Sequence, residues 1–411
     1  MKAKEDVMKG LKGILCFALV AATLFTASCT KSKGYERARI APVVAYAETS
    51  VTAVEMGEES YFAFTSELIK QAYNGNTIVA PLSTFSAIGM AANGAAGQTL
   101  EEIEHAVGEI EGVNAYCLSA RERINKASDE AKASVVSSVW IRDEFEQYVK
   151  EDYLHSVSSY YGPEIFSLPF NKSALKRINN WAFNNTYGMI DKVVEGFKQN
   201  AAMEIISASA VKGKWLDQAK KTRSGEFFAA DGRTTTAEYF SGKSSLFASE
   251  SAYAVRRYMK NGFYLMAVMP NGEIGDYVSS LTAEELYMLF GNEDPRGASY
   301  IMPEFEIEQN TSLVPALRDM GMSLAFDEYY ADFTKMSSYP YGLYITDVNQ
   351  NAKIEVTKNG LEAAATIKVS LGGKATAAPD GEPLYIEFNK PFVYLVCYEK
   401  IPIFAGVVNN V

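Results

Sequence analysis

Apolar residues in the first half of the chain follow mainly helical spacing. Leu68, Ile69 and Ala72 continue a spacing that starts near Phe62, which predicts a helix ending at the turn Asn74-Gly75-Asn76. Further helices are expected where Ser83 provides an N-cap, where Thr99 and Glu102 form a capping box, and over 173–185 and 189–194.

Short segments typical of strands occur along the chain, and most of them lie in its second half. The expected strands are 77–80, 133–141, 205–214, 253–259, 263–269, 300–308, 352–356, 385–388, 391–398 and 403–408. Helices early and strands late favour an α+β fold with large, mostly antiparallel sheets. No linker divides residues 55–411, so we expect one domain there.

The first residues are typical of a secretory signal. Lys9 and Lys12 precede an apolar run over 14–25, which is too short to span a membrane as a mature helix. Thr26-Ala27-Ser28-Cys29 resembles a bacterial lipobox, with Thr26 where Leu is usual. This predicts a lipoprotein signal peptide over 1–28. The alternative is an ordinary signal peptide with an incidental cysteine.

Cys29 would then be the lipidated first residue of the mature protein, and residues 29–54 would form a tether to the globular part. The expected location is extracytoplasmic, anchored to a bacterial membrane by lipid. The sequence leaves open whether this is the periplasm or the cell surface.

Charge and composition exclude several classes of function. A net charge of −11 argues against nucleic acid as a partner. Cys117 and Cys397 lie in apolar surroundings and are interpreted as buried, unpaired thiols. His105 and His155 are the only histidines, and neither lies near a nucleophile motif or in metal-ligand spacing. We therefore expect no cofactor, no metal and no enzymatic activity.

Five segments together resemble the serpin family, in order and at suitable spacing. They are Asn76–Ser83, Ile178–Trp181, Lys212–Trp215, Phe388–Phe392 and Ile403–Asn409. The resemblance runs from about residue 55 to 411 and implies the serpin fold with a mobile reactive loop at about 358–385. In this family a target protease binds the loop as if it were a substrate.

A further segment resembles the hinge of that reactive loop. It consists of Gly360, Leu361, Glu362, Ala363, Ala364, Ala365 and Thr366, with Leu361 where the family usually has Thr. From Leu361 to Leu371, alternate residues are apolar and most of the others are polar, which is strand periodicity with one face made for burial. Glycines at both ends favour a loop instead. The alternative is a permanent strand.

The resemblance implies suicide inhibition of a protease, without a catalytic residue in the inhibitor. A target protease cuts the loop, and the hinge side inserts into the main sheet while the protease is still attached. Family spacing from Gly360 places the scissile bond at Lys374–Ala375, which suits trypsin-like serine proteases. Because the loop is longer than usual, cleavage after Leu371, Gly373, Ala375 or Thr376 by elastase-like or cysteine proteases stays open. A second alternative is a non-inhibitory serpin that acts as a carrier or scaffold.

The resemblance also implies a gate that controls opening of the main sheet. Its matching residues are Ser83, Ser207, Trp215 and Gln350, with Ala80 where a serine is usual. Lys358 and Glu304 match a family ion pair with both signs reversed, so we expect them to pair. Apart from a protease and a membrane, no partner is expected, and the protein should be a monomer.

Overall fold

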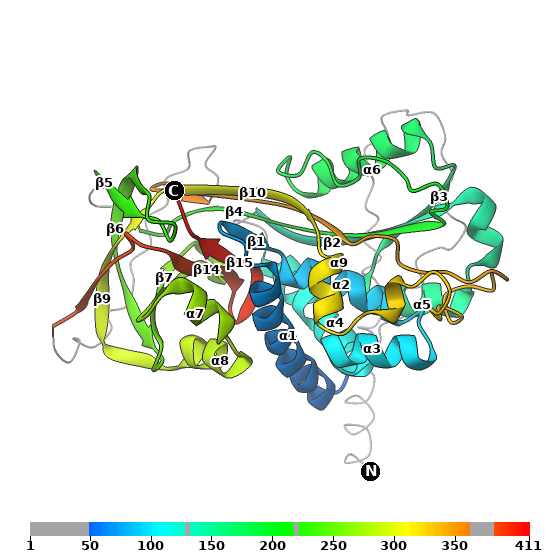
Figure 1. The fold of residues 1–411 in the computed structure, drawn as a ribbon, viewed down its shortest axis with the longest axis horizontal. Coiled ribbons are helices and arrows are strands. Elements are labelled where there is room, and N and C mark those ends of the chain that lie inside the picture. The colour runs from blue at the N-terminus through cyan, green and yellow to red at the C-terminus, as the bar shows by residue number, and fades with distance from the viewer. Residues whose placement is uncertain (1–48, 128–131, 218–221, 362–381) are drawn as a thin grey trace, which may run out of the picture. The chain divides into compact units, whose positions relative to one another are not determined.

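The computed structural model describes residues 49–127, 132–217, 222–361 and 382–411. The predicted signal peptide, Cys29, most of the tether, the hinge residues 362–366 and the bond Lys374–Ala375 lie outside the described residues. Two sheets and a group of helices make up the described part (Figure 1).

The long helices lie in the first half of the chain, as predicted. They are α1 (Val51–Ala72), α2 (Pro81–Ala92), α3 (Gly97–Val107), α4 (Ile110–Ala127), α5 (Glu151–Tyr161) and α6 (Lys172–Asn185). The second half has the shorter α7 (Ile274–Ser279), α8 (Ala283–Gly291) and α9 (Val314–Asp319). None of the described helices is long and apolar enough to cross a membrane.

The larger sheet has nine strands in the order β1-β15-β14-β8-β7-β6-β9-β13, with β5 paired to β6. Their bounds are β1 (Thr77–Val79), β5 (Thr222–Phe228), β6 (Thr234–Ala248), β7 (Ala252–Tyr258), β8 (Phe263–Pro270), β9 (Glu293–Pro303), β13 (Leu384–Glu387), β14 (Phe392–Tyr398) and β15 (Ile401–Val408). Only β13 runs parallel to its neighbour here.

The smaller sheet has six strands in the order β10-β11-β12-β4-β2-β3. Their bounds are β2 (Lys132–Arg142), β3 (Glu164–Leu168), β4 (Met203–Lys214), β10 (Phe305–Ser312), β11 (Asn349–Thr357) and β12 (Gly360–Leu361). Helix α6 lies on one side of this sheet and α1 to α4 on the other (Figure 1). The predicted α+β architecture with mostly antiparallel sheets is confirmed.

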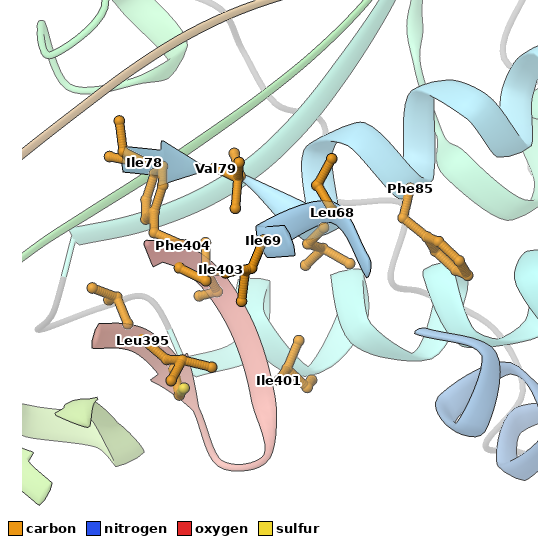
Figure 2. Close-up of a cluster of buried hydrophobic side chains, with 14 of the residues drawn as sticks. Leu68, Ile69, Ile78, Val79, Phe85, Leu395, Ile401, Ile403 and Phe404 are labelled. Atoms are coloured by element: carbon orange, nitrogen blue, oxygen red, sulfur yellow. The ribbon is translucent and has the colours of Figure 1, made fainter. Parts of the chain in front are cut away.

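The main core lies where the first helices meet the last strands. Leu68 and Ile69 of α1, Val79 of β1 and Ile403 and Phe404 of β15 all belong to one cluster of buried side chains (Figure 2). Since β1 pairs with β15, residues from opposite ends of the described chain share this core. Cys117 and Cys397 are buried, unpaired thiols, as predicted, and burial raises the pKa of Cys117 to about 12.

Local sequence signals placed two helix starts wrongly. Helix α2 begins at Pro81 with Ala80 at the N-cap, so Ser83 lies inside the helix. Helix α3 begins at Gly97, and no capping box forms because its two predicted members bind elsewhere. The Thr99 hydroxyl accepts a hydrogen bond from the Asp332 amide, and the Glu102 carboxylate accepts from the amides of Ser323 and Leu324.

Three predicted boundaries also differ from the structure. Residues 189–194 form no helix, because the Asn179 side chain accepts hydrogen bonds from the amides of Val193 and Val194 and fixes an irregular path. The run 300–308 divides at Glu304 into β9 of one sheet and β10 of the other. The tether predicted to reach residue 54 ends earlier, since Ser50 caps α1, which starts at Val51.

Candidate functional site

A gap for one strand separates β4 from β11 in the six-stranded sheet. Along the described residues, β4 pairs with β2 and β12, and β11 pairs with β10 and β12, but the two do not pair with each other. We call the space between them, below β12, the slot. A cavity of about 860 Å³ lies there, lined by 203–209 on one side and 342–351 on the other. Backbone groups along both edges are thus available to an incoming strand.

The hinge enters the upper end of the slot. Gly360 pairs with Thr357 and Lys214, and Leu361 pairs with Val356 and Gly213. Gly360 has φ +155°, and a Cβ there would lie 2.2 Å from the carbonyl oxygen of Gly213, so only glycine fits. The Leu361 side chain is 3% exposed. Leu361, the first apolar residue of the loop, is therefore buried at the upper end before any cleavage.

Trp215, which directly follows β4, lies at this upper end of the slot. Its indole N–H donates to the Thr357 carbonyl oxygen at 2.8 Å, and the side chain is buried. The guanidinium of Arg257 lies 5.1 Å from the centre of the indole ring. Trp215 therefore ties β4 to the end of β11, beside the point where the hinge enters.

Two separate sets of hydrogen bonds hold the edges of the slot to the segment below it. On the β4 side, the hydroxyls of Ser83 and Ser209 are 2.6 Å apart. On the β11 side, the Gln350 amide accepts from the Ala80 amide at 2.7 Å and donates to the Ile78 carbonyl at 2.9 Å. The backbone of Ala80 thus joins this set, although its side chain has no polar group.

The remaining gate residue lies close to these but in a separate contact. The Ser207 hydroxyl lies 3.3 Å from that of Ser137 on β2, so it links β4 to β2 and not to the helix below. Sequence reasoning missed Ser209, which the alternation of β4 places on the same face as Ser207. It also missed Gln309, whose amide holds Ile78 and Asn76 of the same segment. None of these side chains titrates.

Glu304 and Lys358 meet, though not as the predicted ion pair. The Glu304 carboxylate accepts a hydrogen bond from the Lys358 backbone amide at 2.7 Å. Within the described part of the chain, no ion pair joins Glu304 to the exposed Lys358 ammonium. Because the contact is to the backbone, Glu304 holds the turn before Gly360 whatever side chain position 358 carries.

Two acidic side chains lie at the lower end of the slot. Glu204 is paired across strands with Trp140 on one side, and Asp347 precedes β11 on the other. Burial raises the pKa of Glu204 to about 7, and the charge of Asp347 adds to the shift. One oxygen of Asp347 accepts from the Ser312 hydroxyl at 2.6 Å. No hydrogen bond to the Glu204 carboxylate is found among the described residues.

The site is therefore shaped to receive a strand, and its described residues show no catalytic arrangement. His105 and His155 are exposed on different helices, and both described thiols are buried. In the described ranges, no group of His, Cys, Asp and Glu could hold a metal ion.

Comparisons with known proteins agree with this geometry. A family model described as Serpin (serine protease inhibitor) matches residues 59–411. An uncharacterized serpin-like protein of Thermococcus kodakarensis is 27% identical over 348 residues, which cover 81% of this chain and 80% of that protein. Iripin-8 of Ixodes ricinus is 25% identical and is covered to 88%, with 81% of this chain aligned.

Solved structures of a thermophilic serpin, Tengpin, match in two states. The native state gives a TM-score of 0.77 at 26% identity and covers 90% of this chain and 96% of Tengpin. The latent state gives a TM-score of 0.73 at 25% identity, with coverage of 87% and 98%.

Proposed function

The chain belongs to the serpin family, and we propose that it inhibits a protease by trapping it during insertion of the cleaved reactive loop. Serpins are generally protease inhibitors. The observation that carries the proposal is the slot between β4 and β11, with the hinge at its upper end. A strand that filled it would gain backbone hydrogen bonds on both sides.

The residues after the described hinge suit this movement. Ala363, Ala364 and Ala365 are small, so entering a packed sheet costs them little side-chain entropy. About 15 inserted residues at roughly 3.3 Å each would carry the attached protease about 50 Å. A protease distorted at the far end could not complete hydrolysis of the acyl-enzyme.

We propose Lys374–Ala375 as the scissile bond and trypsin-like serine proteases as targets. A cationic side chain before the bond suits an acidic specificity pocket. The test is to mix the protein with trypsin and with elastase-like and cysteine proteases, and to look for a complex that survives denaturing gels. The fragment released with trypsin should begin at Ala375.

A matched control uses trypsin whose nucleophilic serine has been replaced, which should give no stable complex. If active trypsin is not trapped but another protease is, the scissile bond lies elsewhere. If no protease is trapped, the carrier or scaffold alternative takes the place of inhibition.

We also propose that lipid on Cys29 anchors the protein to a bacterial membrane, outside the cytoplasm. The support is the apolar run followed by Ala27-Ser28-Cys29. Replacing the thiol by Cys29→Ser should release the protein from the membrane fraction. A variant that stays membrane-bound, or an unmodified Cys29 in mass spectra of the mature protein, would contradict the anchor.

A further inference from the structure

Glu204 and Asp347, which we call the acidic pair, lie at the lower end of the slot and would be stabilised by a cation between them. Glu204 is the cross-strand partner of Trp140, and both Glu204 and Asp347 line the cavity. Burial and then the negative charge of Asp347 raise the pKa of Glu204. A cation between them would relieve both the desolvation and the repulsion.

The register of β12 indicates which residue of an inserted strand would arrive there. Gly360 and Leu361 pair with Lys214 and Gly213 on β4, and with Thr357 and Val356 on β11. Continuing either register, residue by residue, leads to the same position. Ser370 would lie opposite Glu204 by the first register and opposite Asp347 by the second.

The sequence places a lysine one pleat away from that position. Lys368 would lie on the same face of the strand as Ser370, because side chains two residues apart share a face. Diagonal neighbours in antiparallel sheets lie about 7–8 Å apart, within reach of a long side chain. The small Ser370 side chain leaves room for the lysine to reach past it.

We propose that Glu204 and Asp347 form the docking site for the Lys368 ammonium of the inserted strand, and that this contact holds the strand's lower end. The inference rests on the proposed function, since it needs the strand to insert. Glu204 and Asp347 act as positioning residues. They take no part in the attack of the protease on the loop.

The consequence is a bias on the last step of insertion. The strand enters from Gly360 downward, so Lys368 reaches the acidic pair only when most of the strand is in place. Removing this contact should leave the start of insertion unchanged and weaken its completion. More loop would then be cut without trapping the protease.

The test compares intact protein with protein whose loop has been cut by a non-target protease, and measures the gain in melting temperature at pH 8. Lys368→Met and Glu204→Gln should each reduce the gain. The double variant should lose less than the sum of the two single losses, because both changes act on the same contact. Lys368→Arg keeps the charge and should keep the gain.

A control on the same sheet is Lys353→Gln. Lys353 lies on β11, and its ammonium pairs with Glu306 and Glu308 of β10 and not with the acidic pair. Its loss should lower the melting temperature of intact and cut protein alike, so the gain should not change.

The outcomes separate the two proposals. If cut wild-type protein melts no higher than intact protein, insertion itself fails and the proposed function fails with it. If wild type gains but the losses from Lys368→Met and Glu204→Gln add, the docking site is wrong and the inhibitory function stands.

The pH dependence of the gain in melting temperature is a second measurement, and a simple loss of packing would not change it. The gain of wild type should fall as the pH drops below 7 and Glu204 takes up a proton, whereas Glu204→Gln should flatten this dependence. Arg142, Glu144, Glu195, Lys198 and Glu328 line the same cavity and stay unchanged, so they account for any slope left in the variant.

Discussion

The two sheets of this protein differ in how completely their inner strands are paired. In the nine-stranded sheet, β14 pairs along its length with β15 on one side and β8 on the other, and Phe392 to Cys397 are all buried. In the six-stranded sheet, β4 and β11 each have one complete neighbour and meet the other only at the two residues of β12. The inner strand of the nine-stranded sheet is therefore hydrogen-bonded on both sides, whereas β4 and β11 each keep one edge that is mostly unpaired.

Unpaired backbone edges and an unfilled cavity lower the stability of the intact protein. In the proposed mechanism, the strand that would fill the slot is held at both ends until the loop is cut, and cutting makes this free energy available.

The largest expected effect is a sharp rise in melting temperature after the loop is cut by a non-target protease. Each apolar side chain inserted after Leu361 should add about 1 kcal/mol or more, together with new backbone hydrogen bonds. Thermal unfolding followed by circular dichroism measures the rise. Nicking an ordinary loop would lower the melting temperature or leave it unchanged, and either result here would remove the case for a stored strand.

A charge on the face to be buried should block the same gain. In Ala365→Glu, the inserted strand would carry a carboxylate into the apolar side of the sheet, at a cost of several kcal/mol unless it is protonated. The variant should be cut at the same bond as wild type but release active protease. Complete trapping by this variant, measured as residual protease activity, would contradict insertion.

A core substitution in the nine-stranded sheet should affect intact and cut protein to the same extent. Leu395 of β14 is fully buried, so Leu395→Ala should destabilise intact and cut protein equally, by about 2–5 kcal/mol. Denaturant unfolding of both forms would show this. A loss confined to one form would mean that the nine-stranded sheet also changes on cleavage.

Ionisation of Glu204 at the lower end of the slot should affect the stability of the intact protein. The pKa of Glu204 is raised to about 7, above its value in the unfolded chain. The folded state therefore binds a proton more tightly, and the stability linked to it is lost as the pH rises toward 7 and above. Glu204→Gln should raise the melting temperature of the intact protein at pH 8 and change it little at pH 5.

The smallest effect concerns the turn before the hinge. Glu304→Gln should weaken the contact to the Lys358 amide and cost about 1 kcal/mol, whereas Lys358→Met should cost less, because its ammonium makes no described ion pair. Unfolding of the two single variants and the double variant decides this. Strong coupling that depends on the Lys358 charge would restore the ion pair first expected from the sequence.

Sequence alone predicted the class of fold and most strands. These features depend on local periodicity and on motifs whose residues are close together, such as Lys212–Trp215. The misassigned helix starts have a common cause, because Ser83, Thr99 and Glu102 bind residues more than a hundred positions away instead of capping their own helices.

The contacts around the slot could not be predicted in the same way. Ser83 meets Ser209 across 126 positions, and Gln350 meets Ala80 across 270. A serine or a glutamine has no sequence signal for such a partner, since its role follows only once the strands are placed. Likewise, the facing of Glu204 and Asp347 follows from two registers, which only the folded sheet supplies.

The pairing of β1 with β15 has a consequence for how the protein is made. Thr77 to Val79 pair with Ala405 to Val407, and Tyr61 of α1 donates to the carbonyl oxygen of Pro402. During synthesis the early helices emerge long before the strands that complete their core. We therefore expect the newly made amino-terminal half to stay without its complete native core until the last strand has left the ribosome.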